Sequence, residues 1–163
     1  IRDSLDTDQI IASQYLLLPN LDEMKGHAFE SLDPDFAKKV KSGDFVVGGE
    51  NFGCGSSREQ AASCQRVLGA GANIVNEYAT KRYRSNLINW GMLPFQLNGA
   101  APFGLGDYIL IPHVREALKG DLQNIPAYVL GEEVKPFALY MAPLTSDERE
   151  ILADGCLINY YKH

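Results

Sequence analysis

The stretch that most constrains this chain lies at residues 45–60, where an apolar segment leads into a glycine-rich turn. Phe45-Val46-Val47 is a short apolar run that ends in two glycines, Gly48-Gly49, as a buried strand leaving a sheet does. Gly53 and Gly55 then permit backbone angles and close approaches that a side chain would block. The pattern therefore predicts a buried β-strand followed by a tight turn.

Polar side chains gather at the end of this turn. Ser56 and Glu59 have the S-x-x-E spacing of a capping box, so we expect a helix that begins at Ser56 or Ser57. The first turn of a helix attracts anions, and Arg58 adds a guanidinium that can bind a carboxylate through two hydrogen bonds. Together these groups predict a carboxylate-binding site with a hydroxyl available for proton transfer. The same residues are also typical of an ordinary helix N-terminus.

Composition narrows the class of protein. The chain has 163 residues, of which 45% are hydrophobic and 22% charged, and we expect one soluble globular domain spanning residues 1–163. A net charge of −6 argues against a nucleic-acid partner. No apolar run is long enough to cross a membrane, and Ile1-Arg2-Asp3-Ser4 lacks the apolar core of a signal peptide. We therefore expect a cytoplasmic protein without a membrane partner.

The cysteines predict neither a disulfide framework nor a metal site. Cys54, Cys64 and Cys156 are odd in number and contain no C-x-x-C pair. Such widely spaced thiols suit a reducing compartment and do not form a ligand set for a metal or a cluster. We therefore expect this chain to bind no metal or cofactor, so that any cofactor must come from elsewhere.

Elements after the turn predict a mixed fold. A helix to about residue 68, an apolar strand at 72–75, a helix from about 79 and a strand at 92–97 follow with short connections. Such a strand–helix–strand–helix–strand order favours parallel pairing. After residue 100, recurring Pro and Gly indicate a β-rich part, and Thr145 and Glu148 have the spacing of a capping box that opens a helix ending at Gly155.

Three segments carry a resemblance to a known family. Gly53-Cys54-Gly55-Ser56-Ser57-Arg58-Glu59-Gln60 resembles the signature of the small subunits of 3-isopropylmalate dehydratase and homoaconitase, which are similar to the C-terminal swivelling domain of aconitase. Asp6-Thr7-Asp8-Gln9-Ile10-Ile11 and the helix-to-strand segment at residues 84–94 resemble the same family. One departure is Glu77-Tyr78-Ala79-Thr80, where the family usually has Ser-Phe-Ala-Arg.

The resemblance implies a fold, an activity and a partner. The fold is α/β, a single swivelling β/β/α domain of the aconitase C-terminal type. The activity is that of a hydro-lyase, a dehydratase that isomerises a small hydroxy-di- or tricarboxylate through a cis-enoate. The chain is active only with a large subunit, which carries a [4Fe-4S] cluster. A non-catalytic binding module of the same fold remains the alternative from another class.

The resemblance also implies roles for four polar residues. Ser56 is the base that removes a proton from the carbon beside a carboxylate. Arg58 holds a substrate carboxylate, and Ser57 donates a hydrogen bond to the same group. Asp8 lies at the edge of the active site and orients neighbouring polar groups, although by itself it is equally typical of a turn or an N-cap.

The loop at residues 15–19 predicts the substrate's side group. Homoaconitase-like members of the family have an arginine two residues after the tyrosine, whereas this chain has Leu17 there. Leu16, Leu17 and Leu18 suit an alkyl branch and not a third carboxylate; alternatively, they belong to the core. The loop therefore favours an isopropylmalate-type enzyme such as 3-isopropylmalate dehydratase, an enzyme of leucine biosynthesis, and counts against homoaconitase; 2,3-dimethylmalate dehydratase and another aconitase-like enzyme stay open as alternatives. Exposed leucines would also allow the isolated chain to form homo-oligomers.

Overall fold

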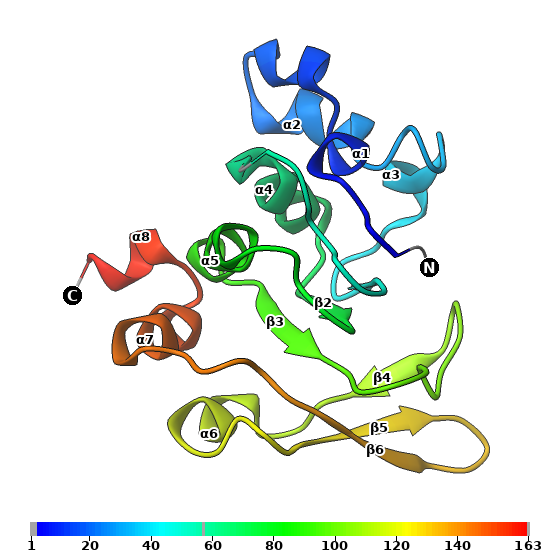
Figure 1. Ribbon diagram of the computed structural model, residues 1–163, viewed down its shortest axis with the longest axis vertical. Coiled ribbons are helices and arrows are strands. Elements are labelled where there is room, and N and C mark those ends of the chain that lie inside the picture. Colours follow the sequence, from blue (N-terminus) through cyan, green and yellow to red (C-terminus); the bar gives the residue numbers. More distant parts are fainter. Residues whose placement is uncertain (1–2, 57, 163) are drawn as a thin grey trace.

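The computed structural model, which describes residues 3–56 and 58–162, contains two three-stranded sheets (Figure 1). The first sheet has the order β1-β2-β3 and is parallel, and the second has the order β4-β5-β6 and is antiparallel. The six strands are β1 (Phe45–Val47), β2 (Ala72–Val75), β3 (Leu93–Gln96), β4 (Tyr108–Leu110), β5 (Ile125–Leu130) and β6 (Lys135–Leu139). The predicted α/β class is confirmed, with an antiparallel sheet after residue 100.

Helices connect the strands of the parallel sheet. α4 (Glu59–Leu68) joins β1 to β2, and α5 (Lys81–Asn89) joins β2 to β3. The predicted parallel pairing is confirmed, since Val46 lies opposite Asn73 and Asn73 opposite Pro94. All four residues of β2 are buried, as expected for the central strand of a sheet covered on both faces.

The predicted capping box at the start of α4 is wrong. The helix begins at Glu59, and Arg58 is its N-cap, with an extended backbone and no capping hydrogen bond from its side chain. Both predicted capping residues are engaged elsewhere. The Trp90 indole N–H donates to the Glu59 carboxylate at 3.0 Å, and the Thr7 hydroxyl donates to the Ser56 carbonyl at 2.8 Å.

Short helical segments of the N-terminal part lie together next to α4 (Figure 1). Their apolar side chains pack with those of α4 in one hydrophobic cluster, which includes Ile10, Ile11, Met24 and Phe29. The segments are α1 (Thr7–Ile10), the 3₁₀ turn η1 (Ser13–Leu17), α2 (Leu21–Met24), the 3₁₀ turn η2 (Lys25–His27) and α3 (Phe36–Lys39).

The second sheet joins the first through one bridge. The Gln96 N–H donates to the Tyr140 carbonyl at 2.7 Å, and the Tyr140 N–H donates back at 2.9 Å. The capping box predicted for Thr145 and Glu148 is confirmed, and the helix that it opens ends at Gly155. Three helices belong to this part: α6 (Val114–Lys119), α7 (Ser146–Asp154) and α8 (Leu157–Tyr160).

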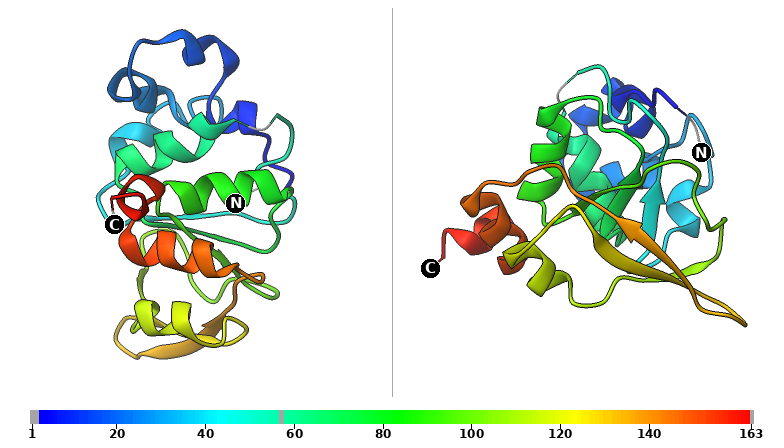
Figure 2. Two further views of the ribbon diagram at one scale, coloured as in Figure 1. Left: turned by 90° about the vertical axis from the view of Figure 1, so that its left-hand side faces the viewer. Right: turned by 60° about the horizontal axis from the view of Figure 1, so that its bottom comes forward.

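The two faces of the second sheet differ. The inner face packs with β3 and α7 in a second hydrophobic cluster, to which Ile125, Ala127 and Leu139 contribute. None of the helices within residues 3–56 and 58–162 crosses the outer face, which Figure 2 (right) turns toward the reader. The side chains on that face are Tyr108, Leu110, Pro126, Tyr128, Leu130, Pro136 and Ala138, as the register shows.

Helices formed by residues 3–56 and 58–162 are all too short or too polar to span a lipid bilayer.

Candidate functional site

Two sequence segments that lie almost fifty residues apart are joined by hydrogen bonds at the candidate site. The Gly53 N–H donates to the Leu5 carbonyl at 2.8 Å, and the Thr7 N–H donates to the Cys54 carbonyl at 2.9 Å. The Thr7 hydroxyl adds the bond to Ser56 described above. The N-terminal segment therefore lines one side of the glycine-rich turn and holds it in place.

Two glycines of the turn are required by its close contacts. Gly53 has a φ of +80°, and a Cβ atom there would lie 2.5 Å from the ring of Tyr83. Gly55 has a φ of +88°, and its Cβ atom would lie 2.5 Å from the Asp6 carboxylate. Any side chain at either position would displace the turn that carries Ser56.

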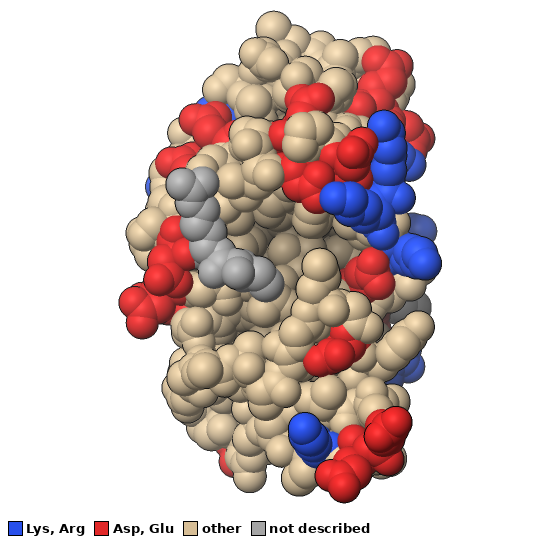
Figure 3. Space-filling model, turned by 90° about the vertical axis from the view of Figure 1, so that its right-hand side faces the viewer, with Lys and Arg blue, Asp and Glu red and all other residues tan. Residues whose placement is uncertain are grey.

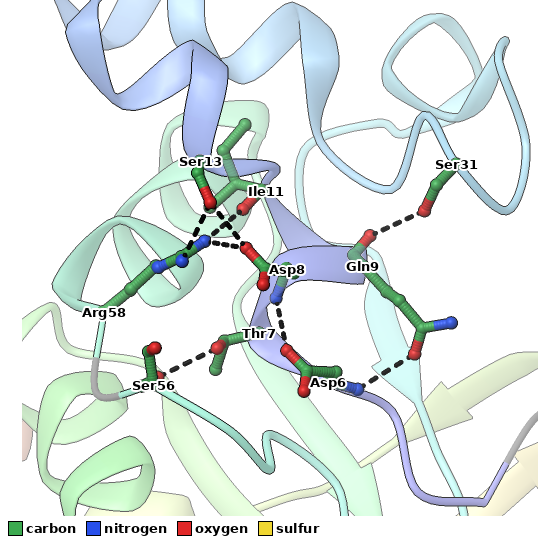
Figure 4. Close-up of polar contacts among 9 residues, drawn as sticks. All are labelled: Asp6, Thr7, Asp8, Gln9, Ile11, Ser13, Ser31, Ser56 and Arg58. Atoms are coloured by element: carbon green, nitrogen blue, oxygen red, sulfur yellow. Dashed lines mark hydrogen bonds and ion pairs between the residues drawn. The ribbon is translucent and has the colours of Figure 1, made fainter.

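Two roles were predicted for Asp8, an N-cap and a residue that orients polar groups, and the structure places the N-cap at Asp6 instead. Asp6 is the N-cap of α1: its carboxylate accepts from the Asp8 N–H at 2.7 Å, and Gln9 completes a capping box. The N-cap alternative is therefore correct for this segment, but it applies to Asp6. The Asp8 side chain points away from the cap toward Arg58 (Figure 4).

Arg58 is held by three acceptors from the N-terminal segment (Figure 4). Its Nη1 forms an ion pair with Asp8 Oδ1 and also donates to the Ile11 carbonyl at 3.3 Å. Its Nη2 donates to the Ser13 hydroxyl at 3.0 Å, and Ser13 donates to Asp8 Oδ1 at 3.1 Å. Hydrogen bonds from Arg58 and Ser13 lower the pKa of Asp8, so the carboxylate is charged at neutral pH.

Ser56 is exposed at the surface, beside Thr7 and on the same turn as Arg58 (Figure 4). The Arg58 side chain is only 16% exposed, so its charge is fixed in a partly buried position. Ser57, predicted to bind substrate, lies outside the described residues. The turn therefore carries an accessible hydroxyl at Ser56 and, two residues later, a guanidinium that is hydrogen-bonded to Asp8, Ser13 and the Ile11 carbonyl.

The three leucines of the predicted substrate loop have different surroundings. Leu16 and Leu18 are partly buried and pack against the first hydrophobic cluster, as the core alternative expects. Leu17 is 89% exposed, so its side chain is available to a ligand or a partner.

Residues of the segment that departs from the family pattern have structural partners. Thr80 is the N-cap of α5 and accepts from the Tyr83 N–H at 3.1 Å. The Tyr78 hydroxyl donates to the Phe95 carbonyl at 3.1 Å. Glu77 is exposed and lines a hollow of about 530 Å³, together with Asp3 and Glu50. Figure 3 shows this side of the molecule, with acidic side chains around a hollowed centre.

Sequence reasoning missed two partners of Arg58, namely Ser13 and the Ile11 carbonyl. A backbone carbonyl leaves no trace in a sequence. Ser13 lies outside the three segments that carry the family resemblance, and a single serine five residues after Asp8 gives no signal by itself.

Comparison with known proteins agrees with this geometry. Residues 10–100 match the protein family described as the aconitase C-terminal domain. The chain is 39% identical over 160 residues to 3-isopropylmalate dehydratase small subunit 1 of Archaeoglobus fulgidus, covering 98% of this chain and 91% of that protein. It is also 39% identical over 161 residues to the methanogen homoaconitase small subunit of Methanothermobacter thermautotrophicus, covering 98% of this chain and 85% of that one.

A solved structure is similar as well. The crystal structure of 3-isopropylmalate dehydratase (LeuD) from Methanocaldococcus jannaschii superposes with a TM-score of 0.76 at 35% sequence identity. The match covers 98% of this chain and 87% of the other. The likeness therefore extends over both sheets and over the candidate site.

Proposed function

This chain belongs to the aconitase C-terminal domain family, among the small subunits of aconitase-type dehydratases, and on that premise we propose that it is the small subunit of a 3-isopropylmalate dehydratase. As such it acts in the cytoplasm, in leucine biosynthesis, as one swivelling unit that closes with a large subunit around the substrate. The observation that supports this most is the orientation of Arg58, which hydrogen bonds with Asp8, Ser13 and the Ile11 carbonyl hold on the same turn as an exposed Ser56.

Ser56 is the base in this proposal. As the alkoxide it takes the proton from the carbon beside a substrate carboxylate during dehydration and becomes the hydroxyl, which returns that proton during rehydration. A serine hydroxyl is a poor base unless the alkoxide is stabilised. Positive potential for that purpose comes from Arg58, two residues away, and from the N-terminal end of α4, which begins at Glu59.

Arg58 and Ser57 bind the substrate carboxylate in this proposal. A guanidinium can bind a carboxylate through two parallel hydrogen bonds, which fixes both the position and the orientation of the acid. Arg58 is only 16% exposed, so solvent screens its charge weakly, while the ion pair with Asp8 neutralises part of that charge.

The described residues do not suit an iron–sulfur cluster. None of their His, Cys, Asp and Glu side chains form a group of three that could hold a metal ion, and Cys54, Cys64 and Cys156 are separate free thiols. In our proposal the [4Fe-4S] cluster therefore belongs to the large subunit, where it supplies Lewis-acid chemistry at the substrate hydroxyl. The residues of this chain bind, orient and exchange protons.

Leu17 supports an alkyl-bearing substrate. Relatives at equal identity include homoaconitase small subunits, so overall similarity does not separate the two activities. An exposed leucine offers apolar contact to an isopropyl group, but it offers no partner for the third carboxylate of homocitrate. Among the alternatives, 2,3-dimethylmalate dehydratase fits Leu17 equally well, and homoaconitase does not.

The test is dehydratase activity of the chain combined anaerobically with its large subunit. Enoate absorbance is followed with 3-isopropylmalate, 2,3-dimethylmalate, homocitrate and citrate. We expect 3-isopropylmalate to be turned over best. Preference for 2,3-dimethylmalate would support the alkyl site but replace the substrate, whereas preference for a tricarboxylate would contradict the role of Leu17. No turnover of any of the four, with an intact cluster, would favour a binding module.

A matched pair of variants sharpens the assignment of the loop. Leu17→Arg introduces a charge where the substrate's alkyl branch is proposed to lie, and we expect kcat/KM for 3-isopropylmalate to fall by at least about tenfold. Leu17→Met keeps an apolar side chain of similar size, so activity should change less than about threefold. Equal effects of the two variants would exclude an apolar contact at this position.

A further inference from the structure

Arg58 has more hydrogen-bond donors than the acceptors it contacts among residues 3–56 and 58–162. A guanidinium carries five N–H groups: two on Nη1, two on Nη2 and one on Nε. Both Nη1 groups are used, by Asp8 Oδ1 and by the Ile11 carbonyl, and one Nη2 group is used by Ser13. One Nη2 group and the Nε group remain without a recorded acceptor in the described part of the chain.

Asp8 and Ser13 occupy the end of the guanidinium, which is formed by one N–H of Nη1 and one of Nη2, and the Ile11 carbonyl accepts from the other N–H of Nη1. Ser13 Oγ and Asp8 Oδ1 lie 3.1 Å apart because the serine hydroxyl donates to the carboxylate oxygen. They therefore face Nη1 and Nη2 side by side, as the two oxygens of one carboxylate would. The donors that remain, on Nη2 and Nε, lie along the other bidentate edge, and they are parallel to each other.

We propose that Ser13 is a positioning residue for Arg58. Its hydroxyl oxygen and Asp8 Oδ1 together bind the Nη1/Nη2 edge as the two oxygens of one carboxylate would, so that the Nη2/Nε edge is directed to the substrate. The inference rests on the proposed function, since it specifies how the same site binds its carboxylate. With the end of the guanidinium occupied, a substrate carboxylate binds side-on, through Nη2 and Nε. Asp8 neutralises part of the charge of Arg58, and Ser13 determines which edge of the guanidinium remains available to the substrate.

Asp8 alone does not determine this orientation. Its side chain is 55% exposed, and a single carboxylate can bind either edge of a guanidinium. The Ser13 hydroxyl removes that freedom, because it donates to Asp8 Oδ1 and accepts from Arg58 Nη2 at the same time. The result is one arrangement of three side chains instead of several.

Ser13 also connects two parts of the proposed substrate site. It is the first residue of η1, the turn that ends at Leu17. A change in the position of Ser13 therefore acts on the proposed alkyl contact and on the carboxylate-binding arginine together. This explains in physical terms how one short segment can match the substrate's acid group to its side chain.

The kinetic test uses the complete enzyme. We expect Ser13→Ala to raise KM for 3-isopropylmalate about tenfold, which corresponds to about 1.4 kcal/mol, with kcat changed less than about threefold. Ser13→Thr restores the hydroxyl at an exposed position, so KM should return to within about threefold of the wild-type value. An unchanged KM in Ser13→Ala, or an increase that Ser13→Thr does not reverse, would overturn the proposal.

Ser31→Ala is the matched control. Ser31 is an exposed serine whose hydroxyl also contacts α1, since it donates to the Gln9 carbonyl at 3.5 Å (Figure 4). It does not contact Asp8 or Arg58 in the described structure. We expect its KM and kcat to equal those of the wild type, and a KM increase as large as that of Ser13→Ala would contradict a specific role for Ser13.

A second readout separates this inference from the proposed function. Nitrogen NMR of the isolated chain reports rotation about the Cζ–Nη bonds of Arg58, whose signals are assigned by their loss in Arg58→Lys. We expect hindered rotation in the wild type and in Ser31→Ala, and clearly faster rotation in Ser13→Ala. Equal rotation in wild type and Ser13→Ala would overturn the positioning role. A complex inactive on all four substrates, with the NMR difference present, would overturn the assigned activity alone.

Discussion

The two sheets of this chain are covered to different extents. β2 is buried at all its positions: Asn73 meets Gln65 of α4 on one side, and Ile74 belongs to the cluster shared with the second sheet on the other. The second sheet buries one face only, and its outer face carries apolar side chains without a single charge. Its strand β5 alternates between buried and less buried residues, as a half-covered strand does.

The difference also separates the candidate site from the supporting structure. All the predicted site residues lie before β2, at residues 8–58, and the family match ends at residue 100, before β4 begins. The parallel sheet therefore holds the loops that carry the predicted site residues, whereas the antiparallel sheet supplies part of the second hydrophobic cluster. Substitutions in the two parts should accordingly affect different measured quantities.

The largest expected effect is on turnover at the candidate site. Ser56→Ala should lower kcat by about 10²- to 10⁴-fold, since it removes the proposed base, and should change KM less. Because the Ser56 side chain is exposed, the free energy of unfolding should change by about 0.5 kcal/mol or less. Steady-state kinetics and urea denaturation of the same preparation measure both quantities. A variant that keeps wild-type kcat would exclude Ser56 as the base.

The second largest effect is on stability and lies in the antiparallel sheet. Leu139→Ala removes a side chain that is 1% exposed on the inner face and should lower the free energy of unfolding by about 2–5 kcal/mol. Leu110→Ala is the matched control on the outer face, at 47% exposure, and should lower it by less than about 1 kcal/mol. Equal losses would mean that the outer face is covered in solution.

A smaller effect tests the polar network within the parallel sheet. The Tyr83 hydroxyl donates to Asn73 Oδ1 at 2.9 Å and accepts from Gln65 Nε2 at 2.8 Å, all three residues being buried. Tyr83→Phe leaves the Asn73 oxygen without this donor and should cost about 1–3 kcal/mol of stability. Tyr108→Phe, on the exposed outer face, should be neutral within about 0.5 kcal/mol. Neutrality of Tyr83→Phe would show that water replaces the hydroxyl.

Sequence patterns predicted the existence of helices and strands better than the residues at which they begin. β1 and the end of α4 at Gly69 follow from short apolar runs and glycines, which act locally. At the mispredicted start of α4, the Glu59 carboxylate accepts from the indole of Trp90, and Thr7 donates to the backbone carbonyl of Ser56; both partners are distant in sequence. Local spacing gives no information on such partners, so a capping-box pattern alone is an incomplete signal.

The candidate site was predictable in its residues and not in its contacts. The family resemblance assigned both Asp8 and Arg58 to the candidate site, but nothing in the sequence predicted that the two form an ion pair. The different exposure of the three leucines could not be predicted either, since periodicity over three residues does not tell which of Leu16, Leu17 and Leu18 faces solvent. These features depend on how η1 and α1 fold against the glycine-rich turn.

The smallest expected effect is on the pH dependence of thermal stability. The pKa of Asp8 is lowered by its hydrogen bond with Arg58, so the stability that the pair contributes is present above the unfolded-state pKa of about 3.9 and is lost as pH falls through the lower folded-state pKa. The Tm of Asp8→Asn should therefore lie slightly below that of the wild type at pH 7, and the two should converge as the pH falls below the folded-state pKa of Asp8. Asp22→Asn, which removes the more exposed pair with Lys25, should differ less from the wild type at pH 7. A Tm difference between wild type and Asp8→Asn that persists unchanged into acid would show that Asp8 stabilises the chain by packing and not through its charge.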